Sequence, residues 1–222
     1  MRQVADGVFE ISIAFVHAHL VVVDDGVVLV DTGLPRRSAK IEQALHEARR
    51  TVGDIRAVLL THWHADHTGG AAEVHRRSGA RIVAHAIDVP VIIGAVPAPL
   101  TALQKVSKLF TGVPEPVAVD EVVSADGPVP VPGFTAVHTP GHTDGHVSYL
   151  LDRDGGVLFA GDAAGGAGTK VRRTPRLMTA DATAADASVA RLAQLRFEVA
   201  VFGHGGAVTT AAADRFRELA AR

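Results

Sequence analysis

The stretch LLTHWHADHTGG, residues 59–70, places three histidines and one aspartate within six positions: His62, His64, Asp66 and His67. Residues two apart do not share a helix face, but they do share one face of an extended chain. The aliphatic run AVLL at 57–60 therefore predicts a buried strand, with the polar cluster at its end. A helix is expected to start near Gly69 or Gly70 and to run through AAEVHRRSG.

The bulk composition is that of an ordinary soluble globular chain, with 222 residues, 47% of them hydrophobic and 21% charged. This length suits one large domain or two small ones. The net charge of −2 carries no signature of a nucleic-acid partner or of membrane association. No apolar run reaches transmembrane length, and the first ten residues are not of signal-peptide type, so a cytoplasmic location is expected.

The chain has no cysteine. This excludes disulfides, cysteine nucleophiles and thiolate metal sites together. Any metal must therefore be held by histidine and carboxylate groups, which suit zinc, iron or manganese.

Alternating short strands and amphipathic helices are predicted along the whole chain. Strands are expected at VFEIS (8–12), AHLVVVDDGVVLVDTG (18–33, with a hairpin turn at Asp25-Gly26), RIVAH (81–85), FTAVHT (134–139), HVSYLL (146–151), GVLFAG (156–161) and VAVFG (199–203). Helices are expected over 36–50, over 99–110 within an apolar insertion at 89–116, over 181–195 with Asp181 as its cap, and after Thr210. The stretch 165–176 reads as a loop.

Two successive units of strands followed by helices predict an α/β fold, a four-layer αββα sandwich of two mixed β-sheets with helices on the outer faces. No linker or low-complexity segment interrupts the pattern. Residues 1–222 are therefore expected to form a single domain.

Four further residues repeat the context of the first cluster, because each follows a predicted strand in a glycine-containing turn: Asp31 in LVDTG, His142 in GHTDGH, Asp162 in AGDAAGG and His204 in FGHGG. A rigid scaffold presents reactive side chains at such turns, and glycine allows close backbone approach. His142, Asp162 and His204 raise the number of candidate ligands to seven. One tetrahedral zinc takes three protein ligands and a water, so seven ligands suit two ions.

These motifs resemble the metallo-β-lactamase-fold hydrolase superfamily, through HxHxDH, the GHTxGH turn, the GD turn, the late GH and the early VVLVDTG. The resemblance covers nearly the whole chain and implies the αββα fold already inferred. It also implies two metal sites that share one ligand. The first site would consist of His62, His64 and His142, the second of Asp66, His67 and His204, and Asp162 would bridge them. Asp31 would orient a metal-binding histidine.

The resemblance implies hydrolysis with two Zn²⁺ ions, with iron or manganese as alternatives. Two ions about 3.5–4 Å apart hold a hydroxide between them and lower the pKa of bound water towards ~7. The hydroxide would attack the carbonyl of a small ester, lactone or thioester. Asp66 would also be catalytic, by orienting the hydroxide or moving its proton.

Other residues near these motifs are expected to have supporting roles. His17 and His19 occupy the place of an early loop that faces the active site in the superfamily, so they are candidate substrate contacts. His138 and His146 are expected to pack or to orient a ligand, and Trp63 to point away from the metals. The apolar stretch 89–110 could form a pocket wall, a homodimer contact or an ordinary part of the core. The basic run 169–176 could bind a substrate carboxylate or phosphate, or be a solvated loop.

Within the superfamily, Asp162 separates the chain from true β-lactamases, and the GHTxG turn is similar to that of glyoxalase II. The HTPGHTDGHVSYL stretch looks like that of acyl-homoserine-lactone lactonases, although the only tyrosine, Tyr149, falls inside a predicted strand. The resemblance therefore implies a glyoxalase II-like or lactonase-like branch, acting on a small-molecule substrate.

Two other functional classes stay open at this point. A persulfide dioxygenase with one iron would use His62, His64 or His142, and Asp162, and would leave Asp66, His67 and His204 without a metal. A metal-free binding module is the third possibility, and the retention of all seven candidate ligands counts against it.

Overall fold

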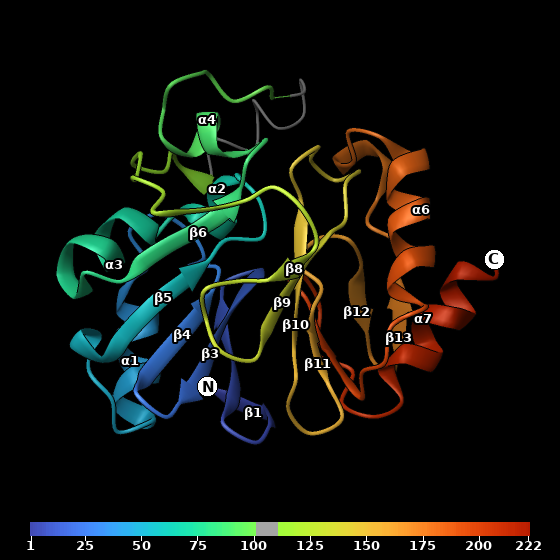
Figure 1. The fold of residues 1–222 in the computed structure, drawn as a ribbon, viewed down its shortest axis with the longest axis horizontal. Helices are drawn as coiled ribbons and strands as arrows, with labels where there is room; N and C mark the ends of the chain where they lie inside the picture. The colour runs from blue at the N-terminus through green and yellow to red at the C-terminus, as the bar shows by residue number, and fades with distance from the viewer. Residues whose placement is uncertain (101–110) are drawn as a thin grey trace.

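The computed structural model describes residues 1–100 and 111–222, and two β-sheets packed face to face form its centre (Figure 1). The first sheet follows chain order: β1 (Arg2–Ala5), β2 (Val8–Ile13), β3 (Val16–Val23), β4 (Gly26–Val30), β5 (Ile55–Leu59), β6 (Arg81–His85) and β7 (Glu121–Val123). Its pairs are antiparallel from β1 to β4 and parallel from β4 to β7. The sheet is therefore mixed, as predicted.

The second sheet has the order β14-β11-β10-β9-β8, with one parallel pair, β11 with β14. Its strands are β8 (Gly127–Pro128), β9 (Phe134–His138), β10 (Val147–Leu151), β11 (Val157–Phe159) and β14 (Val199–Val201). A separate hairpin is formed by β12 (Gly165–Ala167) and β13 (Lys170–Arg172). The second sheet is also mixed, so both halves of the predicted sandwich are confirmed.

Helices cover the outer face of each sheet, which completes the αββα order. Within residues 1–100 and 111–222, the α-helices are α1 (Ala39–Glu47), α2 (Ala65–Thr68), α3 (Ala71–Ser78), α4 (Val89–Ile92), α6 (Ala182–Leu192) and α7 (Ala212–Ala220), and the 3₁₀ turns are η1 (Val52–Asp54) and η2 (Arg176–Met178). Figure 1 shows α1 and α3 outside the first sheet and α6 and α7 outside the second. Among the described residues, no helix is long and apolar enough to cross a membrane.

The central strands are buried on both faces, which explains their continuous aliphatic sequence. In β4, Val28 and Val30 face the core between the two sheets, whereas Val27 and Leu29 face the core beneath the helices. A strand covered on both sides gains from apolar residues at every position, not at alternate ones. The run VVLVDTG therefore marks a strand at the centre of the sandwich, with its polar end at the sheet edge.

Three sequence-based expectations need correction or restriction. Residues 165–176 were expected to be a loop, but they contain the β12–β13 hairpin, held in place where the backbone N–H of Gly166 donates to the carbonyl of His204. The last helix, expected directly after Thr210, begins at Ala212; Ala211 precedes it at φ 48°, and the Glu198 side chain accepts the N–H of Ala211. Of the helix expected over 99–110, residues 101–110 lie outside the described residues. The Asp181 cap is confirmed, because its carboxylate accepts the first free N–H groups of α6.

Candidate metal centre

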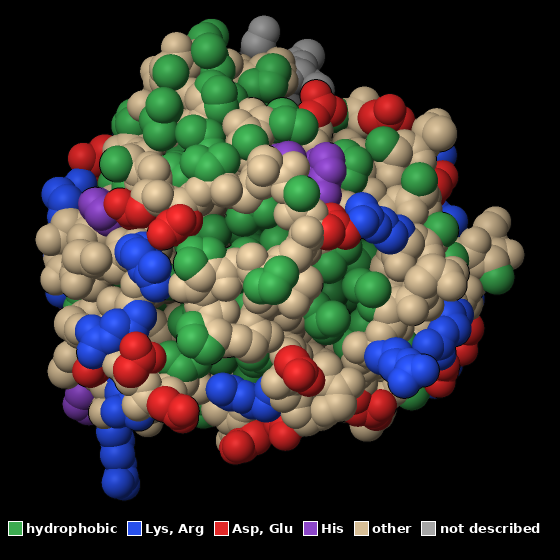
Figure 2. All heavy atoms as spheres, in the orientation of Figure 1, with side chains coloured by type: hydrophobic (Ala, Val, Ile, Leu, Met, Phe, Trp, Pro, Cys, Tyr) green, Lys and Arg blue, Asp and Glu red, His purple; other side chains and the backbone are tan. Residues whose placement is uncertain are grey.

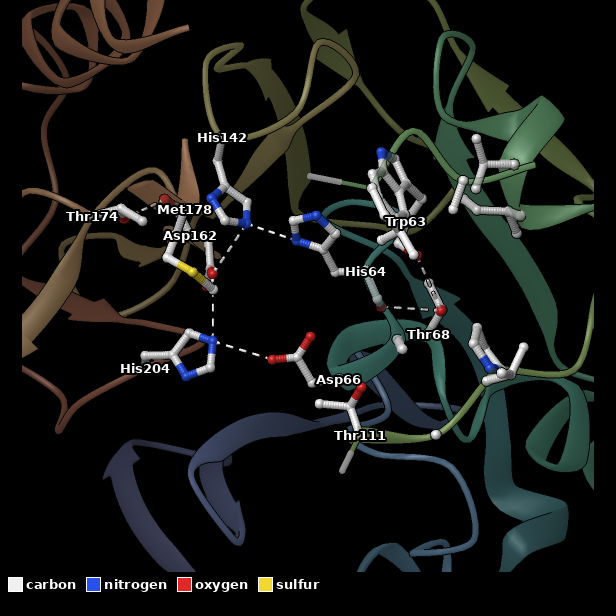
Figure 3. A pocket seen from close by; sticks show the side chains of 18 of the residues that line it. Trp63, His64, Asp66, Thr68, Thr111, His142, Asp162, Thr174, Met178 and His204 are labelled. Atoms are coloured by element: carbon white, nitrogen blue, oxygen red, sulfur yellow. Dashed lines mark hydrogen bonds and ion pairs between the residues drawn. The ribbon is translucent and has the colours of Figure 1, made fainter. Parts of the chain in front are cut away.

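The candidate ligands meet at one edge of the sandwich because of strand direction. The pair β4 and β5 is parallel, and so is the pair β11 and β14, so the carboxyl ends within each pair lie at the same edge of their sheet. Asp31, the 62–67 cluster, Asp162 and His204 all follow these ends, and His142 lies in the loop between β9 and β10. Figure 3 shows the side chains of His64, Asp66, His142, Asp162 and His204 converging on one place.

The backbone changes conformation inside the 59–70 stretch. His64 is extended, with φ −61° and ψ 148°, and it precedes the single turn of α2. The expectation of an extended cluster therefore holds for His64, whereas Asp66 and His67 are helical. His67 stays close to His62, with ring centroids 4.1 Å apart, and it belongs to one ligand group with His62 and Asp162 and to another with Asp66 and His204. One short motif therefore contributes to more than one group of candidate ligands. The next helix, α3, begins at Ala71, as expected.

Three histidines form the first group of ligand atoms. His64 Nδ1 lies 2.9 Å from His62 Nε2 and 2.8 Å from His142 Nε2, and all three side chains are buried. Two nitrogens bound to one zinc at 2.0–2.1 Å lie ~3.3 Å apart in tetrahedral geometry. The cluster therefore has nearly the spacing of a tri-histidine site.

Asp162 lies between this group and a second one formed by Asp66, His67 and His204. Its Oδ2 is 3.3 Å from His142 Nε2 and 3.4 Å from His204 Nε2, and its Oδ1 is 3.5 Å from His67 Nε2. Among the described residues, Asp162 Oδ1 and His67 Nε2 are buried without a hydrogen-bond partner. Leaving such atoms unpaired is costly, and a bound cation would satisfy both. The donor set therefore fits two metal ions that share Asp162.

Asp31 fixes the orientation of two of these histidines. Its carboxylate accepts hydrogen bonds from His67 Nδ1 at 2.7 Å, from the Thr61 hydroxyl at 2.7 Å and from the Thr61 N–H at 2.8 Å. His62 Nδ1 in turn lies 3.0 Å from the Thr61 hydroxyl oxygen. These contacts leave the Nε2 atoms of His62 and His67 facing the site. They also hold Asp31 at φ 58°, a left-handed conformation that is costly outside glycine.

The two histidines that flank His142 support the site without joining the ligand groups. His146 Nε2 accepts the backbone N–H of Asp162 at 2.9 Å, and its Nδ1 lies 2.9 Å from the Thr139 hydroxyl. His138 stacks on His85, with ring centroids 4.2 Å apart, and its Nε2 contacts the carbonyl of Asp144. The contact between His146 and Asp162 corresponds to the orienting role that the sequence suggested.

Asp88 is a supporting residue that the sequence reasoning missed. Its Oδ2 accepts the Trp63 N–H at 3.1 Å and the Thr143 hydroxyl at 3.0 Å, and its Oδ1 accepts the Gly145 N–H at 3.1 Å. The residue is 2% exposed, and burial raises its pKa to about 6. Asp88 therefore ties the loop that carries His62 and His64 to the loop that carries His142. Asp88 follows the end of β6 as Asp31 follows the end of β4. This position after a strand is the sequence feature that could have identified it.

A cavity of about 880 Å³ lies next to the two groups of candidate ligands. His64, Asp66, His142, Asp162 and His204 line one side of it, and residues 91–100 and 111–117 line another. His17 and His19 are not among its lining residues, although they were candidate substrate contacts; His19 is buried against Phe159 instead. Their neighbour in the β2–β3 turn, Phe15, does line the cavity. Trp63 lines it as well, with its ring 4.2 Å from that of His64.

The electrostatics differ between the two groups. Burial and the neighbouring His142 lower the pKa of His64 to about 3, and burial also lowers the pKa values of His62 and His142. Burial opposes protonation of His67 and His204 too, but the nearby carboxylates, Asp162 foremost, outweigh it and raise their pKa values to about 9 and about 11. The first group is therefore neutral at pH 7 without metal, whereas the second group carries protons.

This difference predicts that the two groups take up metal with different pH dependence. A cation must displace the protons on His67 and His204, so the affinity of the second group should rise as the pH increases from 6 to 8.5. The affinity of the neutral tri-histidine group should stay nearly constant over the same range. Zinc titration calorimetry in buffers of different ionisation enthalpy measures both the affinity and the protons released.

The His204→Ala variant keeps the tri-histidine group and allows it to be titrated by itself. Its zinc affinity is expected to be flat with pH, with little proton release. Equal slopes for the variant and for the second binding step of the wild type would contradict the assigned protonation states.

The family model of the metallo-β-lactamase superfamily matches residues 13–204, a range that includes every candidate ligand. The chain belongs to the metallo-β-lactamase superfamily. The predicted resemblance is thus confirmed over most of the sequence. Solved metallo-β-lactamases share the fold: one from Cronobacter sakazakii with a HARLDQ motif superposes with a TM-score of 0.72 at 23% identity, covering 91% of this chain and 79% of that one.

Several proteins that are similar in sequence to this chain are named as hydrolases. A probable metallo-hydrolase of Bacillus subtilis, YflN, is 30% identical over 203 residues, covering 80% of this chain and 75% of its own. A hydroxyacylglutathione hydrolase of Halorhodospira halophila is 35% identical over 136 residues, covering 60% of this chain and 42% of its own. The thioesterase pkgB of Emericella nidulans is 29% identical over 187 residues, 82% of this chain and 43% of its own.

Proposed function

We propose that the protein is a dinuclear metal-dependent hydrolase that cleaves a small ester, lactone or thioester. The observation that carries the proposal is the position of Asp162, whose two carboxylate oxygens face histidines of both ligand groups. Metal-binding carboxylates and histidines on a cavity wall are an arrangement for metal-assisted hydrolysis. Relatives named as a hydroxyacylglutathione hydrolase and a thioesterase support the choice of ester and thioester carbonyls.

In this proposal the tri-histidine group holds one ion and Asp66, His67 and His204 hold the other, with Asp162 shared. When bound, the two ions supply Lewis-acid polarisation of a carbonyl oxygen and activation of water. Zinc suits the mixture of nitrogen and oxygen donors, as iron or manganese also do. The chain itself positions these donors through Asp31, Thr61 and His146, and it offers a cavity in which a small molecule can lie against them.

Asp66 has a second role in this proposal. Its Oδ2 lies 3.4 Å from His204 Nε2, and its side chain is 18% exposed and lines the cavity. Although burial opposes ionisation, the contact with His204 keeps its pKa at about 2, so the group is a carboxylate at neutral pH. It can accept a hydrogen bond from the attacking water, or take its proton, on the side that faces the substrate.

The first test is the metal content of the wild type and of the Asp162→Ala and His204→Ala variants, measured by elemental analysis after purification without added metal. We expect near two zinc ions per chain in the wild type and one or fewer in either variant, together with hydrolysis of thioesters or lactones by the wild type alone. One iron per chain that the His204→Ala change leaves in place would overturn the proposal and favour a mononuclear, persulfide dioxygenase-like oxidoreductase.

A further inference from the structure

The structure points to a substrate with an apolar acyl chain, bound by the part of the cavity that residues 91–100 and 111–117 form. This inference rests on the proposed hydrolase function and narrows its substrate. We call these two segments the apolar wall, because valine, isoleucine, leucine, alanine and proline make up most of its lining positions. The wall faces the same cavity as the ligand groups, so a chain lying on it would extend from a carbonyl placed at the metals.

The apolar wall is anchored in the core. Ile92 and Val117 are both buried in the cluster beneath the first sheet, and the N–H of Val117 donates to the carbonyl of Ile92 at 3.2 Å. Gly94 lies against Pro116, so close that a Cβ on it would be 3.0 Å from the proline ring. The two segments therefore lie side by side and are fixed relative to the sheet. A preformed apolar surface binds a chain without the cost of ordering itself.

Apolar side chains also stand at the mouth of the cavity, where water would otherwise cover them. Val96 and Val113 line the cavity and are 45% and 64% exposed. Phe15 also lines it, is 54% exposed and stacks on the His204 ring. Figure 2 shows hydrophobic side chains gathered on this face around α4. Exposed apolar groups that converge on one pocket indicate an apolar ligand.

Among the described residues, the charges around the wall do not favour a charged substituent at this place. The acidic side chain among its lining residues is Glu115, which pairs with Arg76 at 2.7 Å. The basic lining residues, Arg172 and Arg173, belong to the other side of the cavity, and Arg173 pairs with Asp186. The wall therefore offers contact area and little electrostatic recognition, which suits an alkyl chain.

The test uses a series of neutral thioesters of N-acetylcysteamine with acetyl, butanoyl, hexanoyl and octanoyl groups. Each methylene group removed from water contributes about 0.8 kcal/mol, which corresponds to about a fourfold gain. The ratio kcat/KM of the metal-loaded wild type is expected to rise by about threefold to fourfold for each added methylene, until the wall is filled. A value that stays flat from acetyl to octanoyl would overturn the inference while leaving the hydrolase function intact.

Paired variants locate the effect on the wall. Val96→Ser and Val113→Ser combined should flatten the chain-length series, because both side chains line the wall and are exposed at the cavity. Val122→Ser is the matched control, since this valine is 56% exposed on β7 and does not line the cavity. An unchanged series in the double variant, or an equally flattened one in the control, would contradict the assignment to the wall.

A binding measurement separates this inference from the proposed function. Calorimetry with the neutral amides of the same acids, on protein stripped of metal, should give affinities that rise with chain length and fall in the double variant. If no ester, lactone or thioester is hydrolysed but the amides bind in this way, the hydrolase proposal fails and the apolar site stands. If the amides bind without regard to length, the apolar site fails whatever the catalysis shows.

Discussion

Replacing Gly203 by alanine is expected to lower hydrolytic activity by about 100-fold or more and to reduce bound zinc to about one ion per chain. A Cβ built on Gly203 lies 2.3 Å from Asp162 Oδ1 and 2.4 Å from His67 Cε1, well inside van der Waals contact. The backbone cannot retreat easily, because the Gly203 N–H donates to Gly161 and its carbonyl accepts from His17. The two candidate ligands must therefore move, and the second group loses its geometry.

Metal analysis and thioester turnover measure this outcome, and the tri-histidine group should keep its ion. Gly203 has no left-handed φ, so alanine is compatible with the backbone and the expected effect is local to the ligands. Gly53→Ala serves as the control, because its added Cβ would come no closer than 3.7 Å to another atom and should leave both readouts unchanged. Two zinc ions and full activity in Gly203→Ala would show that Asp162 and His67 do not hold the second ion.

Replacing Asp88 by asparagine is expected to weaken zinc binding at the tri-histidine group by about 10-fold to 100-fold, the range found for partners that orient ligands. The three groups around Asp88 all donate hydrogen bonds, whereas the amide of asparagine can accept only through its single oxygen. At least one buried donor then loses its partner, at a cost of about 1–3 kcal/mol. The loop that carries His64 and the loop that carries His142 are then no longer held in a fixed position relative to each other.

Chelator competition gives the zinc affinity, and the visible spectrum of the cobalt-substituted protein reports the geometry of the site directly. Asp120→Asn is the matched control. The Asp120 carboxylate also accepts a backbone N–H, that of Ile82 in the first sheet, but neither residue is close in sequence to a candidate ligand. Asp88→Asn should alter the spectrum and Asp120→Asn should not. A general loss of melting temperature with an unchanged cobalt spectrum would indicate that Asp88 only stabilises the fold.

Much of this site could be predicted because its residues lie close together in sequence or share a context. His62 and His64 follow a strand that reads as buried from AVLL alone, and the turns at Asp31, Asp162 and His204 repeat that pattern. Parallel strands bring their carboxyl ends to one edge, so residues far apart in the chain could be expected to meet. The same reasoning gave the two mixed sheets and the Asp181 cap.

Other features depend on contacts that no local pattern contains. The role of Asp88 comes from donors on two distant loops, at Trp63 and Gly145, which only the tertiary structure brings together. His19 reads as a site residue by position, yet its strand register turns it between the sheets against Phe159. The β12–β13 hairpin was missed because its glycine and arginine composition is typical of loops, while its pairing is supported from outside by the His204 turn.

The distribution of ligands over both sheets has a consequence for how the protein unfolds. His62, His64, Asp66 and His67 follow a strand of the first sheet, whereas His142, Asp162 and His204 follow strands of the second. Any ion held by both sets joins the two halves of the sandwich, much as a cross-link would. Partial opening that parts the sheets then requires release of the ion, so chelation should speed hydrogen exchange of the inner strands more than that of the outer helices.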